Sequence, residues 1–424
     1  MFVDSLLKLS IEKVAECLVK GHYKHLDFSL EAPLSDQVFS EVNKIKEYYE
    51  YSPVIAKETG LKLNIKNFNF ESIPICGKDF ENLHLHDIDS LVIDLDRLYE
   101  IDDYDREGTY NIVLILKTCL NERSRQNLRK LALKGYADFE KNWVEKLADL
   151  LPNLQSFDHW FDEEEDVLTI CRFFPSLIHL NIHDSCNLNE IHRLKNLQSL
   201  NMNCSLFESS EGLGRLFELP NLLLLDVSKS DGFFRNLLLC EGTFQNLRFI
   251  ESSGSDITET QLRRLVDRNP SLETIIVLGT PCQYTDFSDL PVTILNLANF
   301  KSTMNTLNYT LNKNKIKKKQ VYNSIDRLEA LQKNRTVKGF KEDEFLNLMM
   351  KVTQKCQPQG AEKNMVAKCL IPYFKRLFPK EPINEVLQNL DPKDPLFIER
   401  RWAAQTVLRY FPELARYYLF FPRK

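Results

Sequence analysis

The sequence has no apolar run close to the about 20 residues that a membrane-spanning helix requires. Its 13 glycines and 17 prolines are scattered, which argues against long disordered segments. The 10 cysteines form no Cys-x-x-Cys pair, and some have apolar neighbours, as Cys369 has in Leu370. Such thiols are typical of reduced, buried positions. Charged residues, among them Lys8 and Glu12, interrupt the first apolar stretch, so no secretory signal is expected. We therefore expect a soluble protein of the cytoplasm, the nucleus or both.

Signatures of catalysis and of cofactor binding are also missing. The sequence contains neither a glycine-rich phosphate loop nor a nucleophile elbow nor a His-Glu-x-x-His motif. The net charge is −5, so the protein lacks the positive electrostatic potential that nucleic-acid binding requires. His179, His183, Cys186 and His192 lie close together, but their spacing does not match the paired ligands of a zinc site. We expect no enzyme, no cofactor, no metal site, and no nucleic-acid or membrane partner.

One short phrase, Leu-x-x-Leu-x-Ile in its general form, recurs through the middle of the chain. Successive copies are 20 to 25 residues apart, because their leading apolar residues are Leu154, Leu177, Leu197, Leu222, Leu247, Leu272 and Val292. A period of about 20–29 residues is typical of leucine-rich repeats. Each phrase is expected to form a strand whose conspicuous apolar residues (the Leu and Ile of the phrase) point inward. A turn and a helical segment should follow each strand. Such units stack because none can bury its own apolar face, so the sequence predicts an α/β solenoid.

The alternate strand positions should form an outward-facing ladder of side chains. The ladder is polar near His179 and becomes apolar near Ile276 and Leu278, where the chain's own C-terminal helices could cover it. His84 and His86 are expected at similar outward positions of an earlier strand. We predict that a target protein binds the polar part of the ladder, formed by His179, Asn181, His183, Asn201, Asn203, Asp226, Ser228 and Glu251.

The patterns divide the chain into four parts: a helical region (1–55), leucine-rich repeats (56–305), a basic linker (306–320) and an α-helical domain (321–424). Strand-like pieces at 61–65, 83–85 and 91–95 suggest irregular early repeats. The lysine-rich stretch 313–319 favours a solvated linker over a nuclear-import signal. In the last part, helices are expected near 321–334, 341–356, 361–377, 383–390 and 396–411.

Two amphipathic helices are predicted at the start, over 4–20 and 35–50, with Ser5 and Ser35 as their caps. In the first helix, steps of four residues place Leu6, Ser10, Val14 and Leu18 on one stripe, and Leu7, Ile11 and Leu18 form a second one. A helix that is apolar on two sides has one face for its own protein and one for a partner groove.

Ser5-Leu6-x-x-x-Ser10-x-x-x-Val14 resembles the elongin-binding box of cullin-2 ubiquitin-ligase receptors, with Ser10 where cysteine is usual. Leu34-Ser35-x-x-Val38-x-x-x-Val42 looks like the accompanying cullin box, with Ser35 in place of proline. Together with the repeats and the helical tail, these boxes give a chain that resembles the Zyg-eleven family. The resemblance implies that Ser5, Leu6, Ser10 and Val14 contact elongin, that Leu34, Ser35, Val38 and Val42 contact the cullin, and that 321–424 is armadillo-like.

By this resemblance the chain is the non-catalytic substrate receptor of a ligase built on elongin B, elongin C and a cullin-2-type scaffold, and it holds proteins for ubiquitination. Two alternatives stay open. In one, the chain is a free-standing leucine-rich-repeat interaction scaffold whose first helices only cap the array, as stacked repeats require. In the other, it is an F-box-like receptor that uses a different adaptor and cullin.

Overall fold

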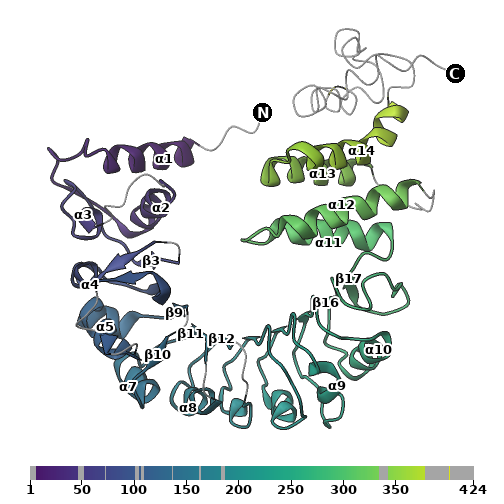
Figure 1. Cartoon of the computed structure of the whole chain (residues 1–424), viewed down its shortest axis with the longest axis horizontal. Helices are drawn as coiled ribbons and strands as arrows, with labels where there is room; N and C mark the ends of the chain where they lie inside the picture. The colour runs from purple at the N-terminus through teal and green to yellow at the C-terminus, as the bar shows by residue number, and fades with distance from the viewer. Residues whose placement is uncertain are drawn as a thin grey trace. The chain divides into compact units, whose positions relative to one another are not determined.

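The structure is a computed structural model, and it describes residues 6–45, 52–71, 73–100, 105–106, 109–135, 137–161, 164–182, 187–333, 342–377 and 401. The chain forms two compact units, Met1–Glu273 (unit 1) and Thr274–Lys424 (unit 2), coloured from purple to yellow in Figure 1. The boundary between the units falls inside the stretch 56–305 that the sequence assigns to one repeat region. The prediction of a mixed α/β fold with parallel strands is confirmed.

Unit 1 contains both helices and strands. Its helices are α1 (Leu6–Val19), α2 (Ala32–Val42), α3 (Ser52–Ile55), α4 (Gly77–Leu83), α5 (Ile112–Cys119), α6 (Glu122–Asn127), α7 (Trp143–Leu150), α8 (Glu164–Phe173), α9 (Phe233–Leu237) and α10 (Glu259–Arg268). Short 3-10 helices span Leu95–Arg97, Ile191–Arg193 and Leu213–Glu218. In Figure 1, α4, α5, α7 and α8 lie on one side of the strands of unit 1.

The main sheet of unit 1 is parallel, and its strands follow one another in sequence order. They are β3 (Asn67–Asn69), β5 (Ser90–Asp94), β9 (Lys130–Lys134), β11 (Ser156–His159), β12 (His179–Asn181), β13 (Ser199–Asn201), β14 (Leu224–Asp226) and β15 (Phe249–Glu251). Smaller sheets pair β1 (Phe28–Leu30) with β2 (Leu61–Leu63), β4 (Ile75–Cys76) with β6 (Leu98–Tyr99), and β7 (Asp105–Arg106) and β10 (Asp138–Phe139) with β8 (Thr109–Tyr110).

The register of the main sheet explains why the phrase repeats. The second apolar residue of each phrase stands beside its counterpart on the next strand, in a row formed by Leu91, Leu131, Phe157, Leu180, Leu200, Leu225 and Ile250. Every side chain in that row is buried. Burial of a Leu or Ile side chain contributes about 1.5–3 kcal/mol. Each strand can gain this contribution only when its neighbours are in register, so the row holds the sheet together.

A feature that the sequence analysis missed is a left-handed residue in the turn after each later strand. Cys204, Lys229 and Gly254 occupy this position in successive repeats, with φ of 63°, 58° and 75°. The conformation costs a residue with a Cβ atom about 1–2 kcal/mol, whereas glycine adopts it freely. The turn is nevertheless used each time, because its backbone bonds to the next repeat, as when the Lys229 N–H donates to the Ser253 carbonyl at 2.8 Å.

A buried hydroxyl follows each left-handed residue, at Ser205, Ser230 and Ser255. The Ser230 hydroxyl donates to the Met202 carbonyl (2.7 Å) and accepts from the Ser205 N–H (3.2 Å), both in the preceding repeat. Because buried backbone groups need partners, the hydroxyl satisfies two groups that the turn would otherwise leave unpaired. Ser230 is therefore a structural part of its turn, whereas the Ser255 hydroxyl has no partner among the described residues.

The region around His86 differs from the prediction. No strand forms at 83–85, because α4 ends at Leu83. His86 is not an outward strand residue either: its side chain is 1% exposed. Its Nδ1 accepts from the Ile65 N–H at 3.3 Å, so Nε2 carries the proton and donates to the Ile55 carbonyl at 2.8 Å. The neutral ring thus joins the end of α3 to the segment between β2 and β3, a contact that the alternating pattern could not predict.

Unit 2 begins with the parallel strands β16 (Thr274–Ile276) and β17 (Thr293–Leu295), and continues with α11 (Phe300–Asn312), α12 (Lys318–Lys333), α13 (Glu342–Cys356) and α14 (Gly360–Leu377). The helices predicted near 321–334, 341–356 and 361–377 are confirmed by α12, α13 and α14. Those predicted near 383–390 and 396–411 lie outside the described residues, Arg401 excepted. Only a short part of the basic segment 306–320 connects helices, since α11 extends to Asn312 and α12 begins at Lys318.

Arg327 fastens the helices of unit 2 to the segment after β17. Its guanidinium donates to the carbonyls of Leu297 (2.8 Å) and Ala298 (3.1 Å) and lies 5.2 Å from the centre of the Tyr284 ring. The helical core itself consists of aliphatic and aromatic side chains of all four helices, such as Leu307, Ile325, Phe345 and Val366.

Protonation of His86 should destabilise the protein. Burial lowers the pKa of His86 to about 4 from an ordinary value of 6.5. The unfolded chain therefore binds the proton first as pH falls, and stability that is complete above pH 6.5 is lost progressively down to pH 4. The full loss would be about 3 kcal/mol. Urea denaturation followed by tryptophan fluorescence at several pH values measures it. His86→Gln should be less stable at pH 7.5 but lack this pH dependence, whereas exposed His25→Gln should keep it.

Two substitutions in equivalent turns should have opposite effects. Lys229→Gly relieves a left-handed residue and should raise the free energy of unfolding by about 0.5–1 kcal/mol. Gly254→Ala introduces the same strain and places a Cβ 3.3 Å from the Lys229 Cγ, so it should lower that free energy by about 1 kcal/mol. Thermal unfolding of the two variants beside the parent chain tests both. If both substitutions changed the free energy of unfolding in the same direction, the left-handed conformation would not be what determines stability at these positions.

Candidate functional site

The first candidate surface is the helix α1, which is buried on one side only. Ile11, Ala15 and Leu18 are buried and face α2, which packs against α1. The opposite side is apolar as well, because Leu6 and Leu9 are 81% and 43% exposed, and Leu7, at the edge beside α2, is 55% exposed. Exposure of neighbouring leucines makes this side of α1 a candidate contact surface.

The residues of the predicted elongin box lie on this exposed side. Leu6 and Ser10 are exposed and Val14 is half-buried, whereas Ser5 lies outside the described residues. The Ser10 hydroxyl donates to the Leu6 carbonyl at 2.7 Å, so it needs no polar partner from another molecule. Leu18, which the sequence assigns to both stripes, is buried. The outward stripe therefore ends at Val14, and the first turns of α1 carry most of the available apolar surface.

The predicted cullin box lies on α2, and most of it faces inward. Leu34 is 39% exposed, but Ser35, Val38 and Val42 are all at most 2% exposed. The prediction that Ser35 caps the helix is wrong: α2 begins at Ala32 with Glu31 at the cap position, and Pro33 occupies the first turn. Ser35 instead donates to the Leu30 carbonyl at 2.6 Å and accepts from the Asn64 N–H at 3.0 Å.

Asp36, which the sequence analysis did not single out, fixes α2 to the start of the sheet. Its Oδ1 accepts from the N–H groups of Lys66 (2.8 Å) and Asn67 (3.0 Å), and its Oδ2 accepts from the Asn67 side-chain amide (2.6 Å). Phe39 packs edge-on against Phe68 of β3, with ring centres 5.2 Å apart. In the sequence, Asp36 could be noticed only as a carboxylate next to the predicted helix start at Ser35, whereas in the structure it is the fifth residue of α2. The helix α2 thus covers the first strand of the main sheet.

A shallow groove of about 260 Å³ lies between the two helices. Leu7 and Ile11 of α1 form its apolar floor, while Lys8 and three polar side chains of α2, Gln37, Ser40 and Glu41, line the rest. The groove adjoins the exposed leucines, so one partner could contact both. The N-terminal pair of helices therefore combines a sealing face and a free face.

The second candidate surface is the outward face of the sheet in unit 1. Asp158, Asn181, Asn201, Asp226 and Glu251 stand side by side on consecutive strands. Along each strand, these outward positions alternate with inward positions such as that of Leu180, as the sequence predicts. His183 lies outside the described residues. The row contains three carboxylates, one of which, Asp158, the sequence analysis did not include.

Several members of the row are held by internal hydrogen bonds. Lys134 forms an ion pair with Asp158, whose other oxygen accepts from the Asn181 amide at 2.8 Å. Asn201 and Asp226 accept from the N–H groups of Asn203 (3.0 Å) and Ser228 (2.9 Å). The Asn181 Oδ1 is buried and has no partner in the part of the chain that the structure describes. An unpaired buried oxygen of this kind lowers the stability of the folded chain.

The face becomes closed toward its later strands. Ser228 and Glu251 are 9% and 6% exposed, and Glu251 accepts from the N–H and hydroxyl of Ser253. His179 is exposed, and partial burial together with the nearby Lys130 lowers its pKa, which keeps the ring neutral. Of the predicted target-binding residues, His179, Asn181, Asn201, Asn203 and Asp226 are therefore the accessible ones.

Two observations on the described residues concern metal binding and thiol chemistry. They contain no group of three or more His, Cys, Asp or Glu side chains that could hold a metal ion. Burial raises the pKa of the Cys171 thiol to about 12 and also raises that of Cys119, which disfavours the reactive thiolate. None of the helices over these ranges is long and apolar enough to cross a membrane.

Comparison with known proteins identifies a relative. No family model matches the chain. Gastrulation-defective protein 3 of Caenorhabditis elegans is 30% identical over 330 residues, which cover 74% of this chain and 45% of that protein. The chain thus spans less than half the length of this relative. Among solved structures, a chain of the Rad7 and Elc1 complex from yeast is 14% identical with a TM-score of 0.26, over 68% of this chain and 98% of its own. A score this low supports no argument. The similarity to Gastrulation-defective protein 3, a member of the Zyg-eleven family, supports the resemblance to that family that the sequence indicates.

Proposed function

We propose that the chain is the substrate-recognition subunit of a ubiquitin ligase built on elongin B, elongin C and a cullin-2-type scaffold. In this proposal the parallel sheet is an array of leucine-rich repeats, the helices of unit 2 are armadillo-like, and the chain itself is not catalytic. The observation that carries the proposal is the exposed outer side of α1, where Leu6 is 81% exposed at the head of the box-like spacing.

The geometry of α1 suits a helix that docks into a groove. Its inner side is already satisfied by α2, so the helix is held in place before a partner arrives. Pre-ordering of this kind reduces the entropy lost on binding. The outer side offers leucines on adjacent turns, the pattern by which amphipathic helices anchor in apolar grooves. Elongin C is the partner that the box spacing of Leu6, Ser10 and Val14 favours.

The cullin-2-type scaffold would contact α2 differently from what the box alone suggests. Ser35, Val38 and Val42 are buried within the chain, so we assign them the role of holding α2 in position. We assign the direct contact with the cullin to Leu34, which is 39% exposed, and to the polar residues that line the groove between α1 and α2.

Target proteins would bind the accessible part of the strand face. The amides of Asn201 and Asn203 and the carboxylate of Asp226 on this face favour partners that form hydrogen bonds. A free-standing interaction scaffold is the second candidate, because α2 demonstrably seals β3 through Asp36 and Phe39. The two candidates differ in what they assign to Leu6: the scaffold gives it no role.

Leu6→Arg should abolish co-purification of elongin B and elongin C with the full chain while leaving the fold intact. The side chain is exposed, so the melting temperature should change by no more than about 2 °C. The matched control is Leu239→Arg, since Leu239 is 70% exposed elsewhere on unit 1. The control should retain both elongins.

Two outcomes would count against the docking proposal. Retention of elongin by Leu6→Arg/Val14→Arg at the parent level would remove α1 as the docking element. A large fall in melting temperature with Leu6→Arg, without elongin association in the parent chain, would favour the scaffold and its sealing helices.

Ser10→Cys should tighten elongin binding. The Ser10 hydroxyl already bonds within the helix, so a partner gains nothing polar from it and must cover its oxygen. A thiol is more apolar and of similar size, and the gain of about 1 kcal/mol corresponds to about fivefold in Kd. Titration calorimetry with purified elongin B–C measures the change. A weaker complex would indicate that Ser10 does not lie in the interface.

A further inference from the structure

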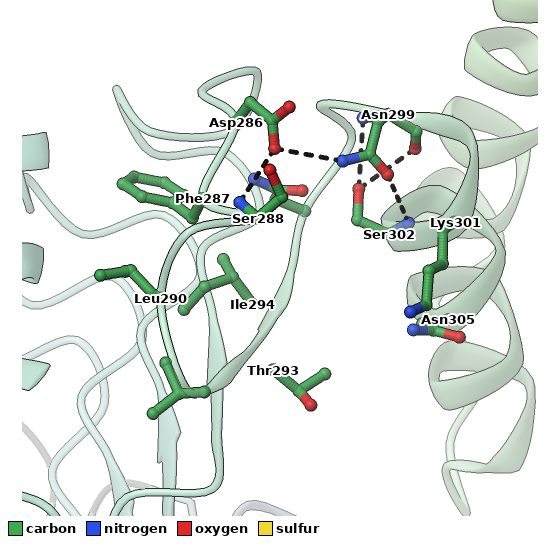
Figure 2. Close-up of a pocket in the computed structure, with 12 residues that line it drawn as sticks. Asp286, Phe287, Ser288, Leu290, Thr293, Ile294, Asn299, Lys301, Ser302 and Asn305 are labelled. Atoms are coloured by element: carbon green, nitrogen blue, oxygen red, sulfur yellow. Dashed lines mark hydrogen bonds between the residues drawn. The ribbon is translucent and has the colours of Figure 1, made fainter. Parts of the chain in front are cut away.

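Unit 2 contains a groove that neither of the candidate surfaces uses. It has a volume of about 240 Å³ and lies between the last strand, β17, and the helix α11. Figure 2 shows Thr293 of β17 on one side, with Lys301 and Asn305 of α11 on the other. Leu290, Val292 and Ile294 supply the apolar part of its lining.

The groove follows an unpaired strand edge. β17 stands at the end of the strand order and pairs with β16 on one side. The Val277 N–H donates to the Leu295 carbonyl at 3.1 Å, which shows that the polar backbone groups of Leu295 point toward β16. Because these groups alternate along a parallel strand, those of Ile294 and Asn296 point to the opposite, free edge.

The helix α11 closes only one end of this edge. The Thr306 hydroxyl donates to the Asn296 carbonyl at 3.0 Å, so that outward group is satisfied. The outward N–H and carbonyl of Ile294 open into the groove instead, and no hydrogen bond joins them to any residue of the described ranges. A free edge of this kind is a template for another strand.

The charges along the groove differ from end to end. Asp286 lines one end, but its carboxylate already accepts from the Ser288 N–H (3.0 Å) and the Asn299 amide (3.3 Å). Lys301 is exposed and forms no ion pair within the described parts of the chain. It lies in the first turn of α11, where the helix dipole adds positive potential. The groove therefore has a negative charge at the Asp286 end, where neutral donors already bond Oδ1, and a positive charge beside Thr293, where Lys301 is exposed.

From this arrangement we propose that the groove binds an extended peptide segment of a partner protein that carries an internal Asp or Glu. The peptide backbone pairs with the N–H and carbonyl of Ile294, as in other cases where a peptide adds a strand to a sheet edge. Its acidic side chain meets Lys301 and Asn305. An apolar side chain on the other face of the peptide contacts Leu290 and Val292.

The proposal does not depend on the ligase role. It uses unit 2 alone, and α1 takes no part in it. If the chain is a ligase receptor, the groove is a second place at which a target peptide can be held; if it is a scaffold, the groove is a peptide site of the scaffold.

A random heptapeptide library displayed on phage and panned against the full chain tests the proposal. The selected sequences should be extended in character and contain Asp or Glu. A synthetic peptide of the selected sequence, measured by fluorescence anisotropy, should bind at least about tenfold more weakly to Lys301→Glu. Panning on Lys301→Glu should select Lys or Arg instead. Methylation of alternate peptide amides should also abolish binding, because it removes the backbone donors.

Two controls separate this site from general charge effects and from the ligase proposal. Lys317→Glu makes the same charge change at an exposed lysine outside the groove and should leave the affinity unchanged. Leu6→Arg should leave it unchanged as well. The proposal is overturned if no peptide is enriched on the full chain, or if enriched peptides bind Lys301→Glu as tightly as the parent. Tight binding of a fully amide-methylated peptide overturns the strand-pairing step.

Discussion

Register between neighbouring strands is the constraint on which the rest of unit 1 depends. The buried row that includes Leu180, Leu200 and Leu225 exists only because each strand presents its aliphatic residue at the same level as the next. No single repeat can bury this surface, so stability comes from interfaces between repeats. The Ser230 hydroxyl and the left-handed turn before it serve the same register, since the hydroxyl accepts from the Ser205 N–H and donates to the Met202 carbonyl of the neighbouring turn.

The first strand of the main sheet must be covered, and the way it is covered generates the candidate docking site. The helix α2 covers the first strand by way of Asp36 and Phe39, and α1 packs on α2. Once the inner side of α1 is committed to α2, its leucines at positions 6, 7 and 9 remain on the outside. The sealing role and the docking role thus belong to different faces of the same pair of helices. For this reason the cap interpretation and the receptor interpretation are compatible at the level of structure.

Sequence patterns predicted the strands and the helices of unit 2 because local periodicity reports directly on one-sided burial. The same patterns failed where a side chain depends on distant contacts. Serine is a common helix-capping residue, but α2 begins before Ser35, with Pro33 in its first turn. The Ser35 hydroxyl accepts from the Asn64 N–H instead. The sequence predicts His86 at an outward position, whereas in the structure its ring bonds to the Ile55 carbonyl and the Ile65 N–H. Glu251 follows the outward alternation and is nevertheless buried.

Hydrogen–deuterium exchange of the full chain, alone and with purified elongin B–C, tests the central claim most directly, because it reports on α1 without any substitution. The account predicts that amides of residues 6–14 become more slowly exchanging in the presence of elongin B–C. Amides in β12 to β15, which face away from the proposed contact, should exchange at the same rate in both samples. Unchanged exchange over residues 6–14 at saturating elongin B–C would contradict the assignment of α1 as the docking helix.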